Sequence, residues 1–483
     1  DLKNEIYSHY QKLDLSFYKR NNTGDLMSRI SEDVSRVRMF LGPATMYPIN
    51  IISLFSLIVY TMLSINVKLT LFVLAPLPIM SISIFYISKV IHQKSERVQI
   101  QLSKLSTFSQ ETFSGIRIIK SFTNEKSNSK FFETETKNYL KENVSLARTN
   151  ALFFPFMLLL IGLSTLLTIY IGGKEAIAGN ITTGNIAEFI IYVNMLTWPM
   201  ASIGWVTSII QRADASQKRI NEFLKTEPEI VNQNNSNSII KGNIRFDKVS
   251  FTYPDTGIKA IENISFELNL GSTLAIVGKT GSGKSTIAQL INRLIIPTKG
   301  EILIDEQKIE SLNLYDLRNN IGFVPQESIL FSDTISNNIA FGLKENNDFE
   351  LIKQAAQKAN VHENIMKFPK QYETKVGERG VTLSGGQKQR VSIARALIKS
   401  PQILIFDDCL SAVDTKTEDS ILSSIKSESK DKTSIIISHR ISTIKHADHI
   451  IVLDKGTVSE QGTHEELIKL NGIYFEINSQ QSI

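Results

Sequence analysis

Four long apolar segments constrain the fold of this 483-residue chain more than any other feature of its sequence. They cover residues 47–65, 69–91, 151–171 and 186–210, and each approaches or exceeds the roughly 20 residues that a helix needs to cross a bilayer. A single segment of this kind could be a buried helix of a large soluble protein. Four of them, arranged in two closely spaced pairs, predict a membrane domain.

The basic residues predict how this domain is oriented. The loops within the two pairs, residues 66–68 and 172–185, contain one lysine each. Residues 1–46 contain seven Lys/Arg, and residues 92–150 contain ten, against six acidic residues. Because basic residues concentrate on the cytoplasmic side, both long segments are expected in the cytosol. The even number of spans returns the chain to the cytosol at residue 211.

Residues 92–150 have a mostly helical pattern that is interrupted at Gly115. Two helices folded back at this glycine would each extend roughly 40 Å beyond the membrane, at a rise of about 1.5 Å per residue. The sequence at the turn, "FSGIRIIKSF", is too apolar to remain in solvent. The helical extensions are therefore predicted to dock on another part of the protein.

The second half of the chain has a different composition. Residues 226–243 are polar and rich in Asn and Ser, which is typical of a linker. Beyond them, short β-rich runs such as "TLAIVG", "ILIF" and "SIIIS" alternate with helical stretches, which predicts an α/β domain with a largely parallel sheet. The expected organisation is an all-α transmembrane domain with long cytoplasmic helix extensions (1–225), a linker (226–243) and an α/β P-loop domain (244–483).

Charge and cysteine content restrict the environment of the chain. The net charge of +5 is modest and does not indicate nucleic acid. The single cysteine, Cys409, excludes an internal disulfide framework and fits a reducing compartment. We therefore expect a multi-pass protein of the cytoplasmic membrane with its α/β domain in the cytosol.

The strongest chemical signal is "GKTGSGKST" at residues 278–286, between an apolar strand and a helix. It satisfies the phosphate-binding pattern G-x4-G-K-[ST], in which backbone N–H groups and a helix N-terminus surround the phosphates of a nucleotide. Lys284 would hold the β- and γ-phosphates of ATP, and Ser285 would coordinate Mg²⁺. The residues predicted to bind the nucleotide in this loop are Gly278, Thr280, Gly281, Ser282, Gly283, Lys284, Ser285 and Thr286.

The run "ILIFDD" ends an apolar strand with two aspartates. The first, Asp407, would lie at the carboxyl end of the strand beside the phosphate loop, where it can support the bound Mg²⁺. The competing interpretation, a buried structural aspartate, is weaker once the phosphate loop is present.

A narrower motif follows at residues 383–397, "LSGGQKQRVSIARAL". Here Ser384, Gly385, Gly386 and Gln387 open a second helix whose N-terminus can face an anion. One nucleotide does not need two such helix starts, so two copies meeting head to tail would each complete the other's site. With these motifs the chain resembles the ATP-binding cassette (ABC) family over nearly its whole length, and specifically the exporter branch.

The resemblance implies further roles. It implies that Tyr253 in "FTYPD" stacks on adenine, that Gln326 in "FVPQE" reaches Mg²⁺ and the attacking water, and that His439 contacts the γ-phosphate. The catalytic set is then Asp408, His439, Gln326 and Lys284, and the metal ligands are Ser285, Gln326 and Asp407. Other matching segments are "SAVD" at 411–414 and "TKVGERG" at 374–380, together with two cytoplasmic coupling segments, "FYKRNNTGDLMSRISEDV" and "ETFSGIRIIKSF".

Two features depart from the family pattern. The exporter half has six spanning helices, whereas four are present here, so the first pair is expected to be missing and the translocation path incomplete. The residue after the Mg²⁺ aspartate is usually Glu, which orients and deprotonates the attacking water, but here it is Asp408. Its carboxylate falls short by about 1 Å, and misplacement on that scale can lower the rate about 10²-fold.

The function that follows is ATP-driven export or flipping of a lipid, an amphipathic drug or a similar substrate across the cytoplasmic membrane. The partner would be a second half-transporter, identical or different, within membrane lipid. In one alternative, a catalytically degenerate subunit binds ATP as a conformational ligand and supports its partner's site. Another is a regulator or channel-like member of the family. A DNA-maintenance ATPase shares the motifs, but the four spans argue against it, so no nucleic acid partner is expected.

Overall fold

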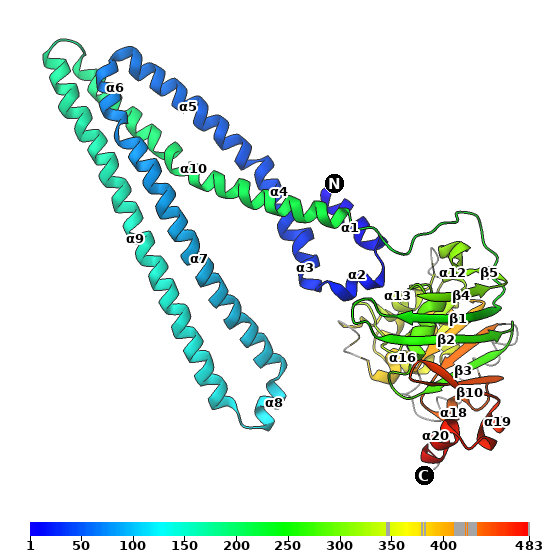
Figure 1. Ribbon diagram of the computed structural model, residues 1–483. Helices are drawn as coiled ribbons and strands as arrows, with labels where there is room; N and C mark the ends of the chain where they lie inside the picture. Colours follow the sequence, from blue (N-terminus) through cyan, green and yellow to red (C-terminus); the bar gives the residue numbers. More distant parts are fainter. Residues whose placement is uncertain are drawn as a thin grey trace. The chain divides into compact units, whose positions relative to one another are not determined.

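The computed structural model describes residues 1–343, 348–377, 380, 383–409, 421, 423 and 432–481 (Figure 1). The chain forms two compact units. The first contains Asp1–Tyr7 and Gly24–Thr226, and the second contains Ser8–Thr23 and Glu227–Ile483. The sequence predicts continuous domains with limits at residues 225 and 243. The two units are instead defined by contacts between residues, so they do not test those limits, which stay a prediction.

The N-terminal part of the chain is helical, as the sequence predicts. Its elements are α1 (Leu2–Lys12), α2 (Leu15–Arg20), α3 (Thr23–Ser28), the π-helical turn η1 (Arg29–Asp33), α4 (Val34–Leu41), α5 (Pro43–Ile65), α6 (Val67–Leu74), α7 (Pro76–Ser114), α8 (Ile116–Ser121), α9 (Glu125–Ile177) and α10 (Thr183–Leu224). Several helix starts follow from local side chains. The hydroxyl of Thr182, for example, accepts a hydrogen bond from the backbone N–H of Asn185 at the start of α10.

Among the described residues, four helical stretches are long and apolar enough to cross a membrane: Thr23–Ile65, Val67–Ser114, Glu125–Ile177 and Thr183–Leu224. They contain the four segments predicted from the sequence. The second segment begins in α6 and continues in α7, where Pro76 occupies the first turn and therefore withholds no helical hydrogen bond. Large apolar side chains on these helices are exposed, among them Leu57, Tyr60 and Phe85. Exposed apolar surface of this extent is typical of helices that face lipid.

Helices α7 and α9 lie side by side and are joined at one end by α8 (Figure 1). Helix α7 ends at Ser114, directly before Gly115, and α9 begins at Glu125. The chain thus reverses where the sequence predicts it. At this tip Phe113, Ile118 and Phe122 are exposed, so the apolar turn has the surface that a docking segment requires.

The second unit is an α/β domain built around two sheets. Its elements are β1 (Ile244–Thr252), β2 (Lys259–Leu268), β3 (Thr273–Gly278), α11 (Lys284–Ile291), β4 (Lys299–Ile304), β5 (Gln307–Lys308), η2 (Ile309–Ser311), α12 (Leu314–Asn319), β6 (Ile321–Val324), α13 (Ile335–Ala340), α14 (Phe349–Lys358), α15 (His362–Met366), η3 (Gln371–Glu373), α16 (Gly385–Leu397), β7 (Ile403–Asp407), β8 (Thr433–Ile437), α18 (Ile441–Ile444), β9 (His449–Asp454), β10 (Thr457–Gly462), α19 (His464–Lys469) and α20 (Ile473–Gln481).

The larger sheet has the strand order β10-β9-β3-β8-β7-β6, and its pairings are parallel except that between β9 and β10. The smaller sheet is antiparallel, with the order β2-β1-β4-β5. Side chains alternate across the larger sheet. In β7, Ile403 and Ile405 enter the core shared with the smaller sheet and α11, whereas Leu404 and Phe406 enter the core beneath α13, α14 and α16. Burial on both faces explains why this strand is a continuous apolar run.

Residues 226–243 contain no helix or strand, but they are bound to the second unit. The Asp305 carboxylate accepts hydrogen bonds from the backbone N–H groups of Lys241, Gly242 and Asn243. The backbone N–H of Ser238 donates to Asp316. The predicted linker is therefore irregular in structure but held along the surface of the α/β domain by side-chain acceptors.

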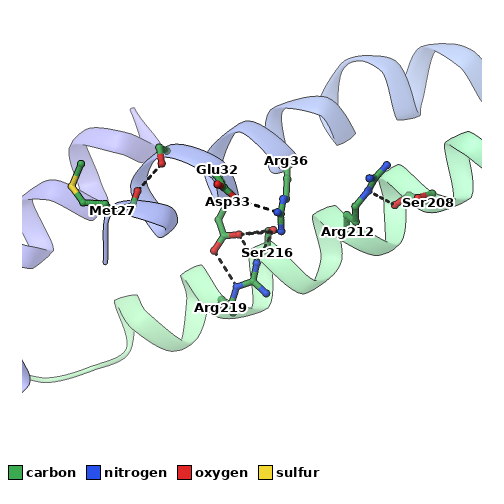
Figure 2. Close-up of polar contacts among 9 residues, drawn as sticks. Met27, Glu32, Asp33, Arg36, Ser208, Arg212, Ser216 and Arg219 are labelled. Carbon is green, nitrogen blue, oxygen red and sulfur yellow. Dashed lines mark hydrogen bonds and ion pairs between the residues drawn. The ribbon is translucent and has the colours of Figure 1, made fainter. Parts of the chain in front are cut away.

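A buried carboxylate joins the early and late helices of the first unit (Figure 2). Asp33 of η1 is 2% exposed. It accepts hydrogen bonds from the Ser216 hydroxyl (2.8 Å) and from Nε of Arg219 (3.1 Å), both on α10. A buried charge is stable only when it is paired and hydrogen-bonded. This cluster therefore links η1 to the last turns of α10.

We expect Asp33→Ala to lower the free energy of unfolding of the first unit by about 2 kcal/mol, because Arg219 and Ser216 lose a charged acceptor. In the purified protein this corresponds to a fall of roughly 5 °C in the apparent melting temperature. Glu32→Ala is the matched control, since Glu32 lies beside Asp33 but forms an exposed ion pair with Arg36. Equal shifts for the two variants would contradict a stabilising role for the buried cluster.

Candidate functional site

A cavity of about 340 Å³ lies at the carboxyl edge of the larger sheet in the second unit. Three of its strands deliver side chains there: the phosphate loop follows β3, Asp407 ends β7, and His439 follows β8. The carboxyl ends of parallel strands are where α/β sheets bind their ligands. Eleven of the predicted site residues line the cavity: Tyr253, Thr280, Gly281, Gly283, Lys284, Ser285, Thr286, Gln326, Asp407, Asp408 and His439.

The phosphate loop has the conformation that its glycines allow. Gly283 has φ +99°, and a Cβ at this position would lie 2.3 Å from the carbonyl oxygen of Ala260. Only glycine fits there, and α11 begins directly afterwards at Lys284. The Lys284 ammonium donates hydrogen bonds of 2.8 Å to the carbonyl oxygens of Gly278 and Lys279. The loop thus closes around its own lysine, with the first backbone N–H groups of α11 beside the cavity.

The charge of Lys284 also fits a phosphate group. Burial lowers the pKa of Lys284, and the nearby charges of Asp408 and Asp407 oppose this shift. A phosphate placed in the cavity would supply Lys284 with both an acceptor and a negative charge. The Ser282 hydroxyl is buried and has no hydrogen-bond partner in the structure, but it does not line the cavity.

Ser285 and Asp407 form the part of the site that fits a metal ion. The Ser285 hydroxyl donates a 3.0 Å hydrogen bond to Asp407, which is 5% exposed. Burial raises the pKa of Asp407, this hydrogen bond lowers it, and the charge of Asp408 raises it again. Within the described residues, no group of three or more His, Cys, Asp or Glu side chains could hold a metal. Hydroxyl and carboxylate oxygens that leave room for phosphate oxygens suit Mg²⁺.

The remaining predicted catalytic residues meet at the same edge. Asp408 has φ +44°, a left-handed conformation, and its backbone N–H donates to the carbonyl oxygen of Ile437 (2.8 Å). Burial lowers the pKa of His439, and the Lys284 charge lowers it further, whereas the charges of Asp408 and Asp407 oppose this shift; the net lowering favours the neutral imidazole. Gln326, just beyond β6, is exposed and lines the cavity.

Sequence reasoning missed Lys19, which contacts Tyr253 at the aromatic end of the cavity but does not line the cavity itself. The Tyr253 hydroxyl lies 3.3 Å from that of Thr286, and its ring packs edge-on against Phe251. The ammonium of Lys19, on α2, lies 4.9 Å from the centroid of the Tyr253 ring. The neighbouring Arg20 forms an ion pair with Asp255. The sequence signal was the segment "FYKRNN", which indicates a coupling element but no contact with a particular aromatic ring.

The structure does not bring every predicted residue to the cavity. Gly278 and Ser282 belong to the phosphate loop but do not line the cavity. Ser384 caps α16, where its hydroxyl accepts from the Gln387 N–H, and both Ser384 and Gly385 are exposed. The group Ser384, Gly385, Gly386 and Gln387 therefore lies apart from this cavity. Residues 411–414, and positions 378 and 379 of the 374–380 segment, fall outside the described residues.

Comparison with known proteins agrees with both halves of the chain. Residues 1–200 match the family described as ABC transporter transmembrane region, and residues 261–411 match the family described as ABC transporter. The chain is 37% identical over 484 residues to the probable multidrug resistance ABC transporter ATP-binding/permease protein YheI of Bacillus subtilis (strain 168). That match covers 100% of this chain and 83% of the relative.

Two other relatives extend the comparison. An ATP-dependent lipid A-core flippase of Syntrophus aciditrophicus is 35% identical, with 100% of this chain and 80% of the relative covered. The structure of a bacterial Atm1-family ABC exporter with ATP bound superimposes with a TM-score of 0.82 at 30% identity, covering 99% of this chain and 85% of that one. These likenesses confirm the predicted family and fold class. The chain thus belongs to the ABC transporter family, as an exporter of the cytoplasmic membrane whose cytosolic ATP-binding domain follows its membrane-spanning domain in one polypeptide.

Proposed function

We propose that this chain uses ATP hydrolysis to export or flip a lipid, an amphipathic drug or a similar molecule across the cytoplasmic membrane. The observation that carries the proposal is one cavity in which a phosphate loop, two aspartates, a glutamine and a histidine meet. The described part of the same chain contains four helices apolar enough to cross a membrane. The names of the relatives, a multidrug resistance transporter and a lipid A-core flippase, favour an amphipathic substrate. These names do not identify a single substrate.

The geometry supports a specific division of roles in the cavity. Lys284, now bonded to the loop carbonyls, is placed to exchange these acceptors for the β- and γ-phosphates. Ser285, Asp407 and Gln326 are the residues that would hold Mg²⁺, which when bound neutralises the charge that develops on the transferred phosphoryl group. Neutral His439 can donate a hydrogen bond to the γ-phosphate from one ring nitrogen. Tyr253 offers its ring to adenine.

Asp408 is the residue we propose to orient the attacking water. It lines the cavity beside Lys284, Asp407 and His439. Because its side chain is one methylene shorter than that of Glu, we expect slow hydrolysis in comparison with a Glu-containing site. The cavity also contains the cation, the Mg²⁺-holding residues and the histidine that the proposed chemistry uses. For that reason we favour a working but slow ATPase over a subunit that only binds ATP.

A second copy of an ATP-binding domain completes the proposed site. Ser384 and Gly385 are exposed at the start of α16 and do not line their own chain's cavity. An exposed helix start with free N–H groups can contact the nucleotide of another subunit. We therefore propose a dimer of half-transporters, with an identical or a different partner.

The transport proposal predicts that Lys284→Ala abolishes ATP-dependent movement of substrate. In proteoliposomes we expect its ATPase rate to fall at least about 10²-fold, because a preorganised cation at the phosphates is lost. Lys279→Ala is the matched control: it changes an exposed lysine of the same loop, whose backbone carbonyl remains to accept from Lys284. Transport is followed with a fluorescent short-chain phospholipid and, separately, an amphipathic dye. Substrate movement that is independent of ATP, or equal in the two variants, would contradict the proposal.

The role of Asp408 predicts that Asp408→Glu raises the steady-state Mg²⁺-dependent ATPase rate, by up to about 10²-fold, since the carboxylate regains its reach. Asp408→Asn should instead lower the rate below that of the unmodified protein. Asp454→Glu makes the same change at the end of β9, outside the cavity, and should have no effect. If Glu brings no gain and Asn causes no loss, another group positions the water.

A further inference from the structure

A cavity with a strongly basic lining lies between α7 and α9 of the first unit, far along the chain from the nucleotide site. Its volume is about 580 Å³. Four cationic side chains line it: Lys94 of α7, and Lys137, Lys141 and Arg148 of α9. No acidic side chain is among its lining residues. Neither the nucleotide chemistry nor the packing of the helices accounts for this concentration of positive charge.

The four cations differ in how they are engaged. The Lys94 ammonium donates to the Thr149 hydroxyl (2.8 Å) and to the Ser145 carbonyl oxygen (3.2 Å), which fixes it across the two helices. Lys137 forms an exposed ion pair with Glu133 (2.7 Å). Among the described residues the structure gives Lys141 and Arg148 no carboxylate partner. Lys141 and Arg148 thus lack a counter-charge, and so does Lys94, whose only partners given above are neutral oxygens.

The cationic side chains share one helical face with apolar ones. On α9, Lys137, Lys141, Val144 and Arg148 follow one another at the three- and four-residue spacing of a helix surface. Leu140 and Val144, which also line the cavity, are 61% and 40% exposed. A site that combines unpaired cations with exposed aliphatic side chains matches a ligand with an anionic group and an adjoining hydrocarbon part.

The cavity lies next to the cytoplasmic ends of two predicted spans. Lys94 lies within one helical turn of the predicted span 69–91, and Arg148 lies within one turn of the predicted span 151–171. Lys141 lies about two turns further into the cytosol, roughly 10 Å along α9, and its long side chain can extend back toward the membrane. Cytoplasmic segments of membrane proteins generally contain an excess of basic residues. That rule does not explain why four of them line the same cavity.

From this geometry we infer that the cavity between α7 and α9 binds the phosphate headgroup of an anionic phospholipid from the cytoplasmic leaflet. The phosphate contacts Lys94 and Arg148, Lys141 adds a second cation to a headgroup with more than one anionic group, and Leu140 and Val144 contact the first part of the acyl chains. Basic hollows between helices at this depth attract such lipids. The site is separate from the nucleotide cavity and does not depend on which substrate is transported.

The test measures lipid binding to the purified membrane-extracted protein by native mass spectrometry, with cardiolipin, phosphatidylglycerol and phosphatidylcholine as probes. We expect saturable binding in the order cardiolipin, phosphatidylglycerol, phosphatidylcholine. Lys141→Gln and Arg148→Gln should each weaken cardiolipin binding about fivefold, and the double variant about 25-fold, because each basic side chain near an anionic headgroup contributes comparably. Phosphatidylcholine binding should not change.

Lys130→Gln is the matched control, because Lys130 is an exposed lysine of α9 that does not line the cavity. Its cardiolipin affinity should equal that of the unmodified protein. Basal ATPase activity, retained in every variant, shows that each is folded. The inference is overturned if the double variant binds cardiolipin as tightly as the control, or if the three lipids bind equally. Displacement of cardiolipin by millimolar inorganic phosphate would also overturn it, since the cavity would then be a phosphate site without a lipid component.

Discussion

The parallel pairing of β3, β7 and β8 is the constraint on which the rest of the ATP-binding domain depends. The register aligns Ile276 of β3 with Ile437 of β8, and Ile437 with Asp407 of β7. Because parallel strands end at the same edge, the phosphate loop, the aspartate pair and His439 emerge within one cavity. A shift of one residue in any of these pairings would turn the apolar side chains of the strand to the opposite core and move its terminal functional group.

Burial sets the electrostatics at this edge. Desolvation is the largest influence on the pKa of Asp407, Lys284 and His439, and in each case it disfavours the charged form. The phosphate loop therefore holds a lysine bonded to its own carbonyl oxygens, and β7 holds an aspartate with a single hydroxyl donor. Such groups gain from a ligand that carries both phosphate and a divalent cation. This is the physical reason for proposing that these residues bind a nucleotide rather than only forming part of a stable core.

In the membrane unit, two groups of charged side chains have opposite roles. Asp33 is buried and held by two donors on α10, which connects the segment before the first span to the helix that leads toward the ATP-binding domain. The basic cavity between α7 and α9 is the reverse case, because Lys94, Lys141 and Arg148 have no carboxylate partner within the described part of the chain. The Asp33 cluster stabilises the packing of the helices, whereas the unpaired cations of the basic cavity can attract an anionic ligand.

Several properties follow from the sequence alone, since they depend on local chemistry. The apolar segments at 47–65, 69–91, 151–171 and 186–210 must be helical in lipid, because only internal hydrogen bonds can satisfy their backbone. The glycines of 278–286 permit a loop that other residues cannot form, and Gly115 marks the turn after α7. The strand that ends beside the phosphate loop predicted the place of Asp407, and the family resemblance implied those of Tyr253, Gln326, Asp408 and His439. All five line the cavity.

Only the tertiary structure decided which distant residues meet. The contact of Lys19 with Tyr253, and that of Asp33 with Arg219, join residues that are about two hundred positions apart or more. Such pairs are set by the packing of whole helices and sheets, and no local pattern encodes them. The exposure of Ser384 is likewise set by tertiary packing, because it depends on where α16 packs against the rest of the domain. Lys94 and Arg148 likewise form one basic hollow only because α7 and α9 turn back on each other at Gly115.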